Sequence, residues 1–148
     1  MERISSKLTM SFSNIEVLSK DRGWKMLANV EGRFQIDIND RLFFDEEGIL
    51  VLEIASALMK WIERIKSGNI IDFCYESMDY EDRLLLRFAR NNNTWRVYSV
   101  WELFTDRTNF SLKEITDASQ KYIAELLKYL KNNFKLDFLR FLQTEEFK

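Results

Sequence analysis

The beginning of the chain alternates apolar and polar positions. The alternation is clear in residues 8–12 and strongest near the end of the stretch 24–38. A period of two is typical of strands that bury one face, so the pattern predicts extended structure in both places. Asn39 and Asp40 follow and predict a tight turn, because both residue types tolerate left-handed backbone angles. We expect residues 42–44 to form a short returning strand.

A helical pattern replaces the alternation between Asp45 and Gly68. Its apolar positions recur at helical spacing and form one broad stripe, made of Leu50, Val51, Ile54, Ala55, Leu58, Met59, Ile62 and Ile65. Asp45, Glu46 and Glu47 stand where the partial positive charge of a helix N-terminus favours acids, and Gly68 is a natural stop. A helix with so wide an apolar stripe is expected to pack centrally against a sheet.

The second half of the chain repeats this order of strands followed by a helix. Residues 71–75 alternate apolar and polar side chains and predict a strand, and residues 83–90 and 94–104 predict two more. The asparagines at 91–93 tolerate turn conformations and predict a hairpin between those two strands.

A second long helix is predicted to begin at Ser111. Ser111 and Glu114 have the spacing of a capping box, in which each side chain accepts a hydrogen bond from the backbone of the other residue. Apolar residues at helical spacing continue from Leu112 to Phe134. Residues 136–142 predict a further turn or two of helix, and residues 144–148 are expected to fray.

Together these elements predict a single α+β domain over residues 1–148. Neighbouring strands joined by tight turns imply an antiparallel sheet of about six strands. Two long amphipathic helices need an apolar face to cover, so we place both on one face of the sheet. The predicted order is β-β-β-α-β-β-β-α-α.

Absences in the composition narrow the chemistry. The chain has no histidine, one cysteine and four glycines. Without histidine there is no imidazole base, no histidine-activated nucleophile and no histidine-ligated zinc. The glycines are too far apart for a phosphate-binding loop, and Cys74 has no basic flank, so we expect a buried, inert thiol. We expect no enzyme, cofactor or metal, and the catalytic alternative left open is an enzyme that uses paired carboxylates or Tyr, Lys or Arg chemistry.

The N-terminus and the charge balance bear on location and partners. Residues 1–7 lack the apolar run of a signal peptide, and no stretch approaches the roughly 18 apolar residues of a membrane helix. We therefore expect a cytoplasmic protein that does not enter membranes. The formal net charge of −2 argues against a dedicated DNA or RNA binder.

A change of sign divides the charges in the second half of the chain. Residues 72–82 hold five acids and no base, and residues 83–101 hold four arginines and no acid. One interpretation is a set of cross-strand ion pairs. The other is an acidic surface for a basic partner, with Met78 or Tyr80 as an apolar anchor. The predicted binding residues are Glu76, Met78, Asp79, Tyr80, Glu81 and Asp82, together with Asp45, Glu46 and Glu47.

Aromatic residues near the arginines leave two further alternatives. Phe88, Trp95, Tyr98 and Trp101 are interleaved with the arginines, which suits a sheet that stacks RNA bases, but the spacing lacks an RNA-binding signature. The second alternative is a small-molecule or regulatory binding domain, in which Trp95, Tyr98 and Trp101 line a pocket between sheet and helix. Otherwise we expect Trp61, Trp95 and Trp101 in or beside the core.

Two regions of the chain resemble a class of bacterial proteins. Leu42-Phe43-Phe44-Asp45-Glu46-Glu47 leads into Leu58-Met59-Lys60-Trp61, and Ser77-Met78-Asp79-Tyr80-Glu81-Asp82 is followed by Trp95-Arg96-Val97-Tyr98-Ser99-Val100-Trp101. In these regions, within residues 30–130, the chain is similar to immunity proteins encoded beside polymorphic or contact-dependent toxins. The resemblance implies a protein that occludes a toxin domain, which the acidic surface predicts to be basic. It carries over no catalytic residue.

The same sequence leaves a homodimer open. An exposed sheet edge offers unpaired backbone groups, and the segment 136–147 is apolar.

Overall fold

The computed structural model describes residues 6–19, 23–76 and 84–137 of the chain. In chain order its elements are β1 (Leu8–Val17), a 3-10 helix (Gly23–Ala28), β2 (Val30–Ile38), β3 (Arg41–Ile49), α1 (Val51–Lys66), β4 (Phe73–Glu76), β5 (Leu84–Asn91), β6 (Thr94–Tyr98) and α2 (Leu112–Phe134). The predicted α+β class and the order of strands and long helices are confirmed. The helical turn predicted at 136–142 lies outside the described residues from residue 138 onward, and so does the end predicted to fray at 144–148.

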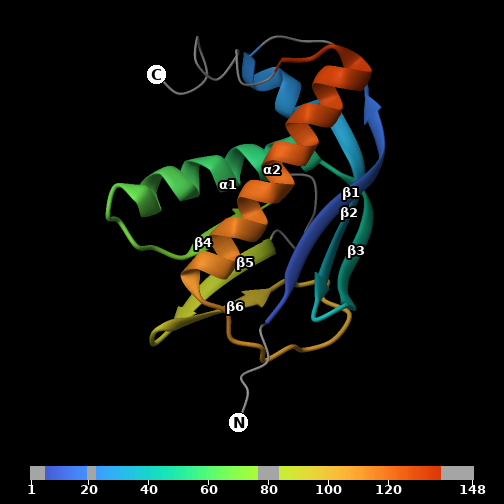
Figure 1. The fold of residues 1–148 in the computed structure, drawn as a ribbon. Coiled ribbons are helices and arrows are strands. Elements are labelled where there is room, and N and C mark those ends of the chain that lie inside the picture. The colour runs from blue at the N-terminus through green and yellow to red at the C-terminus, as the bar shows by residue number, and fades with distance from the viewer. Residues whose placement is uncertain (1–5, 20–22, 77–83, 138–148) are drawn as a thin grey trace.

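The six strands divide into two antiparallel sheets of three, where the pattern predicts one sheet. β1, β2 and β3 form the first sheet, and β4, β5 and β6 form the second. The loop between β6 and α2 occupies an edge of each sheet (Figure 1). The N–H of Leu103 donates to the carbonyl of Phe43 in β3 at 2.8 Å, and Phe110 pairs with Trp95 in β6. Both edges therefore bond to this loop instead of to each other.

The predicted turn at Asn39 and Asp40 is confirmed, and the strand after it is longer than predicted. Both residues have positive φ angles, 53° and 66°. β3 then runs to Ile49, well past the predicted end at residue 44. It can do so because its cross-strand pairing with β2 continues beyond that point, after a bulge.

This longer strand corrects the prediction that Asp45, Glu46 and Glu47 begin a helix. Asp45 and Glu46 pair with Gln35 and Phe34 of β2, and α1 begins only at Val51. The acid in the first turn of α1 is Glu53. Charge at a helix N-terminus is a weak effect, and the hydrogen bonds of the strand ladder outweigh it here.

Two other predicted strands are too long. Residues 23–28, inside the stretch 24–38, form the 3-10 helix, whose Met26 is buried in the core. β6 ends at Tyr98 instead of residue 104, and Ser99 begins a turn in which its carbonyl accepts from the N–H of Glu102 at 3.3 Å. In both places apolar side chains reach the core from a turn, so their spacing alone does not identify a strand.

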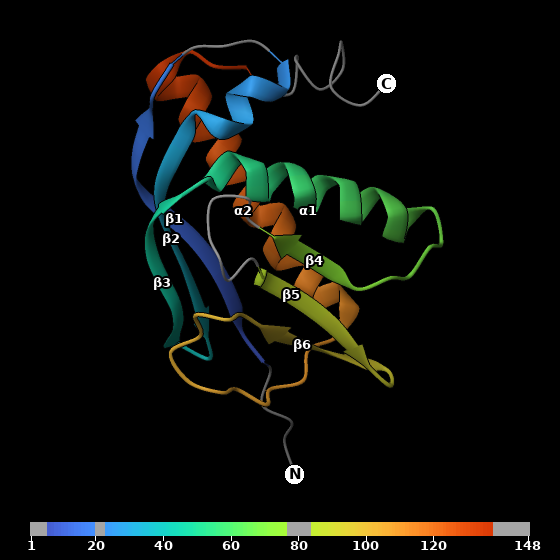
Figure 2. The same ribbon diagram turned by 180° about the vertical axis from the view of Figure 1, so that it is seen from behind.

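Both helices lie on the same side of the first sheet, and part of the core fills the space between them (Figures 1 and 2). Tyr122 of α2 is fully buried, and its hydroxyl donates to the carbonyl of Val51 at 2.6 Å. Its ring packs edge-on against Phe34 of β2, with 5.3 Å between the ring centroids. The capping box that begins α2 is present as predicted, with both reciprocal hydrogen bonds between Ser111 and Glu114.

Trp61 of α1 connects this core to the second sheet. Its indole N–H donates to the carbonyl of Ile71 at 2.8 Å. Its ring makes edge-on contacts with three aromatic residues of the second sheet, Phe73, Phe88 and Trp95. Trp61 and Trp95 are buried, and Trp101 is half-buried against the core, as predicted.

Candidate functional site

One face of the first sheet, called here the outer face, is covered by neither helix (Figures 1 and 2). In β2 every second residue from Val30 to Ile38 is buried, so the intervening residues point outward, namely Glu31, Arg33, Gln35 and Asp37. Cross-strand partners share a face of a sheet. The partners of these residues on the outer face are Thr9, Ser11, Ser13 and Glu16 of β1 and Leu42 and Asp45 of β3.

The charges on the outer face are mostly negative. Among the described residues of its three strands, five carboxylates lie there with one cation, Arg33; the carboxylates are Glu16, Glu31, Asp37, Asp45 and Glu47. Three of them, Glu16, Glu31 and Glu47, line a shallow hollow of about 400 Å³ beside Arg33. The outer face therefore concentrates negative charge on a chain whose formal net charge is only −2.

Glu16 and Glu31 are direct cross-strand partners. Like charges in this position destabilise an antiparallel pair, because their side chains leave the sheet side by side. Within the described residues neither glutamate forms an ion pair that would relieve the repulsion.

Arg33 does not neutralise the hollow, because its guanidinium is held by Asp45. Two hydrogen bonds of 2.6 Å join Nε and one terminal nitrogen of Arg33 to the two carboxylate oxygens. This bidentate bond and the attraction of the guanidinium hold the pKa of Asp45 below its usual value, against partial desolvation, and they raise the pKa of Arg33. Both groups stay charged at neutral pH.

Backbone irregularities border the hollow on both sides. β1 has a register shift between Ser13 and Glu16, with Asn14 at a φ of 53°. The β2–β3 ladder has another between Gly32 and Phe34. Bulges re-aim side chains locally and recur beside functional sites. Gly32 cannot carry a side chain here, since a Cβ would lie 2.6 Å from the side chain of Ile15.

The structure divides the predicted binding residues. Asp45 and Glu47 lie on the outer face, whereas Glu46 is the cross-strand partner of Phe34, which points to the covered side. Glu76 is exposed at the end of β4, in the other sheet. The remaining predicted binding residues, Met78, Asp79, Tyr80, Glu81 and Asp82, lie outside the described residues. Sequence reasoning missed Glu16, Glu31 and Asp37, although the alternation of β2 already places the last two on one face.

Between the acidic segment 72–82 and the arginine-rich segment 83–101, the described residues form one of the predicted cross-strand ion pairs. Arg87 donates to the carboxylate of Asp72 at 3.1 Å, and the same carboxylate accepts from the backbone N–H of Arg90 at 3.0 Å. The Nε of Arg96 donates to Asn109 at 3.1 Å. These described arginines are therefore engaged in bonds that hold the second sheet and its loop.

The aromatic residues considered for base stacking or a ligand pocket are mostly covered. Phe88 and Trp95 are buried, so neither offers a ring face to a base. Tyr98 and Trp101 are half-buried. Three hollows on the described part of the chain are lined by other residues, and Trp95, Tyr98 and Trp101 line none of the three.

Cys74 is exposed, which corrects the prediction of a buried thiol. Its neighbours Phe73 and Tyr75 point into the core, so the alternation of β4 turns Cys74 outward, opposite Arg87. Partial desolvation and the nearby carboxylate of Glu76 raise the pKa of the thiol. The thiol therefore stays protonated and weakly nucleophilic at neutral pH.

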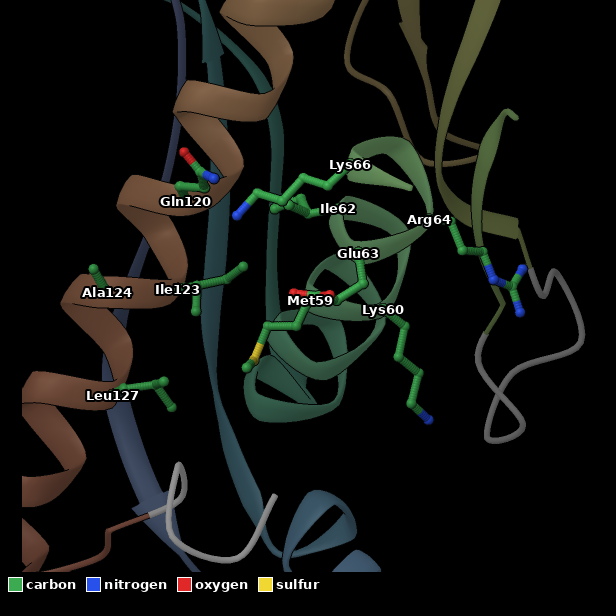
Figure 3. A pocket seen from close by; sticks show the side chains of 10 residues that line it. All are labelled: Met59, Lys60, Ile62, Glu63, Arg64, Lys66, Gln120, Ile123, Ala124 and Leu127. Atoms are coloured by element: carbon green, nitrogen blue, oxygen red, sulfur yellow. The ribbon is translucent and has the colours of Figure 1, made fainter. Parts of the chain in front are cut away.

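A second surface feature, which sequence reasoning did not find, is an open groove between α1 and α2 (Figure 3). It has a volume of about 740 Å³. Its apolar lining comes from both helices, namely Met59, Ile62, Ile123, Ala124 and Leu127, and its polar lining is Lys60, Glu63, Arg64, Lys66 and Gln120. We refer to it as the helix groove.

The described residues offer neither a metal-binding cluster nor a membrane-spanning helix. No group of three or more acidic or cysteine side chains there is placed to hold a metal ion. Among the same residues, no helix has the length and apolar character needed to cross a membrane.

Comparison with known proteins places the chain in a family. The family model described as a domain of unknown function (DUF7878) matches residues 5–132. The chain belongs to this family. The match includes every strand and most of α2, and therefore both the outer face and the helix groove. No curated protein and no solved structure matches the chain.

Proposed function

We propose that this protein is a non-catalytic binding module that uses its outer face to bind a basic protein. The observation that carries the proposal is the charge of that face, which is covered by neither helix and whose described residues include five carboxylates and one arginine. Together with the resemblance of the sequence, this supports an immunity protein that neutralises a toxin domain in the cytoplasm by occluding it.

Electrostatics gives the outer face a physical role in association. A surface of one sign steers an oppositely charged partner and raises the association rate, more strongly at low salt. A lysine or arginine of the partner placed between Glu16 and Glu31 would also remove their mutual repulsion. The free protein holds these two charges at a cost in stability that a basic partner relieves.

Leu18 supplies an apolar anchor beside these charges. Its side chain is 56% exposed, and its backbone N–H donates to the carbonyl of Asn29 at 2.8 Å, which extends the β1–β2 ladder by one residue. Because Leu18 stands two positions after Glu16, it lies on the same face. An apolar side chain next to charged groups can anchor a protein interface, where a few residues provide most of the binding energy.

The test is co-purification with the product of the neighbouring gene, followed by binding kinetics. Glu31→Lys should slow association about tenfold at low salt, and the loss should shrink as salt screens the charges. Glu125→Lys is the matched control, because Glu125 is exposed on α2, away from the outer face. Equal effects of the two variants, or no complex at all, would contradict the proposal.

The anchor is tested separately with a pair of exposed leucines. Leu18→Ala should speed dissociation, while Leu103→Ala, at a position 59% exposed on the loop after β6, should leave it unchanged. If Leu18→Ala is also silent, the outer face binds by charge alone and Leu18 is not an anchor.

A further inference from the structure

The helix groove has properties that a basic protein partner does not explain. Its walls run from Met59 to Lys66 on α1 and from Gln120 to Leu127 on α2. At about 1.5 Å of rise per residue, each wall is about 10 Å long, or two helical turns. Ile62 and Ile123 form the floor and are almost completely buried, while Ala124 leaves room above it.

Two polar groups of the groove, Lys66 and Gln120, lie near each other at one end (Figure 3). Figure 3 shows Lys66 extending across the groove toward Gln120, whereas Lys60 and Arg64 point away from α2. Lys66 has no ion-pair partner among the described residues. Glu63 lies farther along α1, beside Met59 (Figure 3). The groove thus has an amine and an amide at one end and an apolar bed along the rest.

The size of the groove favours a small molecule over a protein segment. Stable protein interfaces bury about 800 Å² on each partner, which a groove of two helical turns cannot provide. Sites for small molecules are typically about 300–1,000 Å³ and mostly apolar, with a few placed polar groups. The volume of about 740 Å³ and the apolar floor fit this second class.

We propose that the helix groove binds a straight-chain carboxylate, whose head meets the amine of Lys66 and whose alkyl chain covers the apolar floor. The head is an anion because the cation stands at the end of the groove, where a charged group keeps part of its hydration while the chain lies on the floor. The lining disfavours a cationic head, because it holds three cations, Lys60, Arg64 and Lys66, and one acid, Glu63. This site does not depend on the outer face.

The test uses three probes with the same chain, below their micelle concentrations. Octanoate carries an anionic head, octanol a neutral head and octyltrimethylammonium a cationic head. In NMR titrations, the methyl signals of Ile62, Ile123 and Leu127 should shift, with octanoate binding most tightly and the ammonium least. Equal affinity for the three, a preference for the ammonium, or no shift of these methyls would overturn the proposal.

Matched variants locate the two parts of the ligand. Lys66→Glu should weaken octanoate binding about tenfold, the expected effect of losing one charge-assisted hydrogen bond, and leave octanol within twofold. Lys131→Glu is the control, because it makes the same charge change in the last turn of a helix, α2, at an exposed residue that does not line the groove. Equal losses of octanoate affinity in the two variants would mean that the net charge of the protein causes the loss, and would overturn the role of Lys66.

The alkyl chain is tested by filling the groove. Ala124→Phe should abolish binding of octanoate and octanol alike, while Glu125→Phe, one residue farther along α2 and outside the groove, should abolish neither. Circular dichroism and thermal melting verify that both variants are folded. Retained binding in folded Ala124→Phe would show that the chain lies elsewhere.

Discussion

The outer face and the helix groove differ in chemistry: the first is charged and the second is mainly apolar. The outer face is a sheet surface whose charged side chains are mostly acidic, and whose backbone is fixed by cross-strand hydrogen bonds. The helix groove is an apolar gap between two helices with one amine directed across its end. The first can attract a partner at long range, and salt weakens that attraction. The second acts only on contact, by removing apolar surface from water, which salt does not weaken.

The contrast also separates what each surface requires of the fold. The outer face depends on strand register, because a slip of one residue would turn its carboxylates toward the core. The helix groove depends on how α1 and α2 cross. Variants that damage one support and spare the other can therefore separate the two surfaces.

The largest effect is expected for Gly32→Ala, which attacks the support of the outer face. The new Cβ would lie 2.6 Å from the Ile15 side chain and 2.9 Å from the Ser13 carbonyl. Overpacking of this kind costs about 1–3 kcal/mol, and we expect the upper end because the second contact is backbone. Urea denaturation measures it. Gly68→Ala, where no atom lies within 4 Å but φ is +92°, is the control for backbone strain alone. An equal loss in both would mean that the bulge yields freely.

A smaller effect is expected for Tyr122→Phe, at the helix crossing. The variant leaves the buried carbonyl of Val51 without the 2.6 Å hydrogen bond from the tyrosine hydroxyl. We expect a loss of about 1–2 kcal/mol in the free energy of unfolding. Octanoate binding should weaken as well, while binding of a basic partner should not. Tyr129→Phe, at a position 36% exposed, is the control and should be neutral.

Glu31→Gln should stabilise the free protein, which is unusual for a substitution at a proposed binding site. Removing one charge of the Glu16–Glu31 pair relieves a repulsion worth about 0.2–1 kcal/mol. The gain should fall as salt rises and should be accompanied by slower association with a basic partner. Thermal melting at low and high salt measures the gain. A variant that is less stable at low salt would mean that Glu31 serves the fold and not a partner.

The smallest effect concerns the pH dependence at Asp45. Its pKa is lowered in the folded protein, so its bond to Arg33 contributes stability above the unfolded pKa, near 3.8. That contribution is lost as the pH falls through the lower, folded pKa. Asp45→Asn should therefore reduce stability slightly at neutral pH and flatten the acid limb of the stability curve. An unchanged acid limb would mean that the pair contributes nothing in solution.

The sequence was most informative where local chemistry decides structure. The capping box at Ser111 and the turn at Asn39 and Asp40 depend on neighbouring residues, and both were predictable. Asp45 lies in a strand because it pairs with Gln35 of β2, which comes earlier in the chain. The acids and apolar residues around Asp45 resemble the start of a helix, and the prediction from them was wrong. The division into two sheets was not predictable, and the loop bond at the β3 edge joins Leu103 to Phe43, residues too far apart for any local pattern to contain.

The candidate surfaces follow the same rule. The acids of the outer face come from three strands, and only β2 shows by its own alternation which of its residues face outward. Assigning Glu16 to the outer face required the β1–β2 register on the far side of a bulge. The helix groove could not be predicted, because it depends on how α1 and α2 cross. The apolar residues of both helices predict only a core-facing stripe, and some of them line the groove instead. The sequence shows which residue types are present, but it does not show which side chains from different strands and helices lie together.

The loop that closes the edges of both sheets also has a consequence for the order of folding. The pairing of Phe110 with Trp95 joins residues near each other in the chain, whereas the bond from Leu103 to Phe43 joins residues on either side of α1 and the whole second sheet. Contacts between distant residues carry a larger closure entropy and tend to form late. The β3 edge should then stay open longest during refolding, and in that interval the chain is most exposed to pairing with another copy of itself.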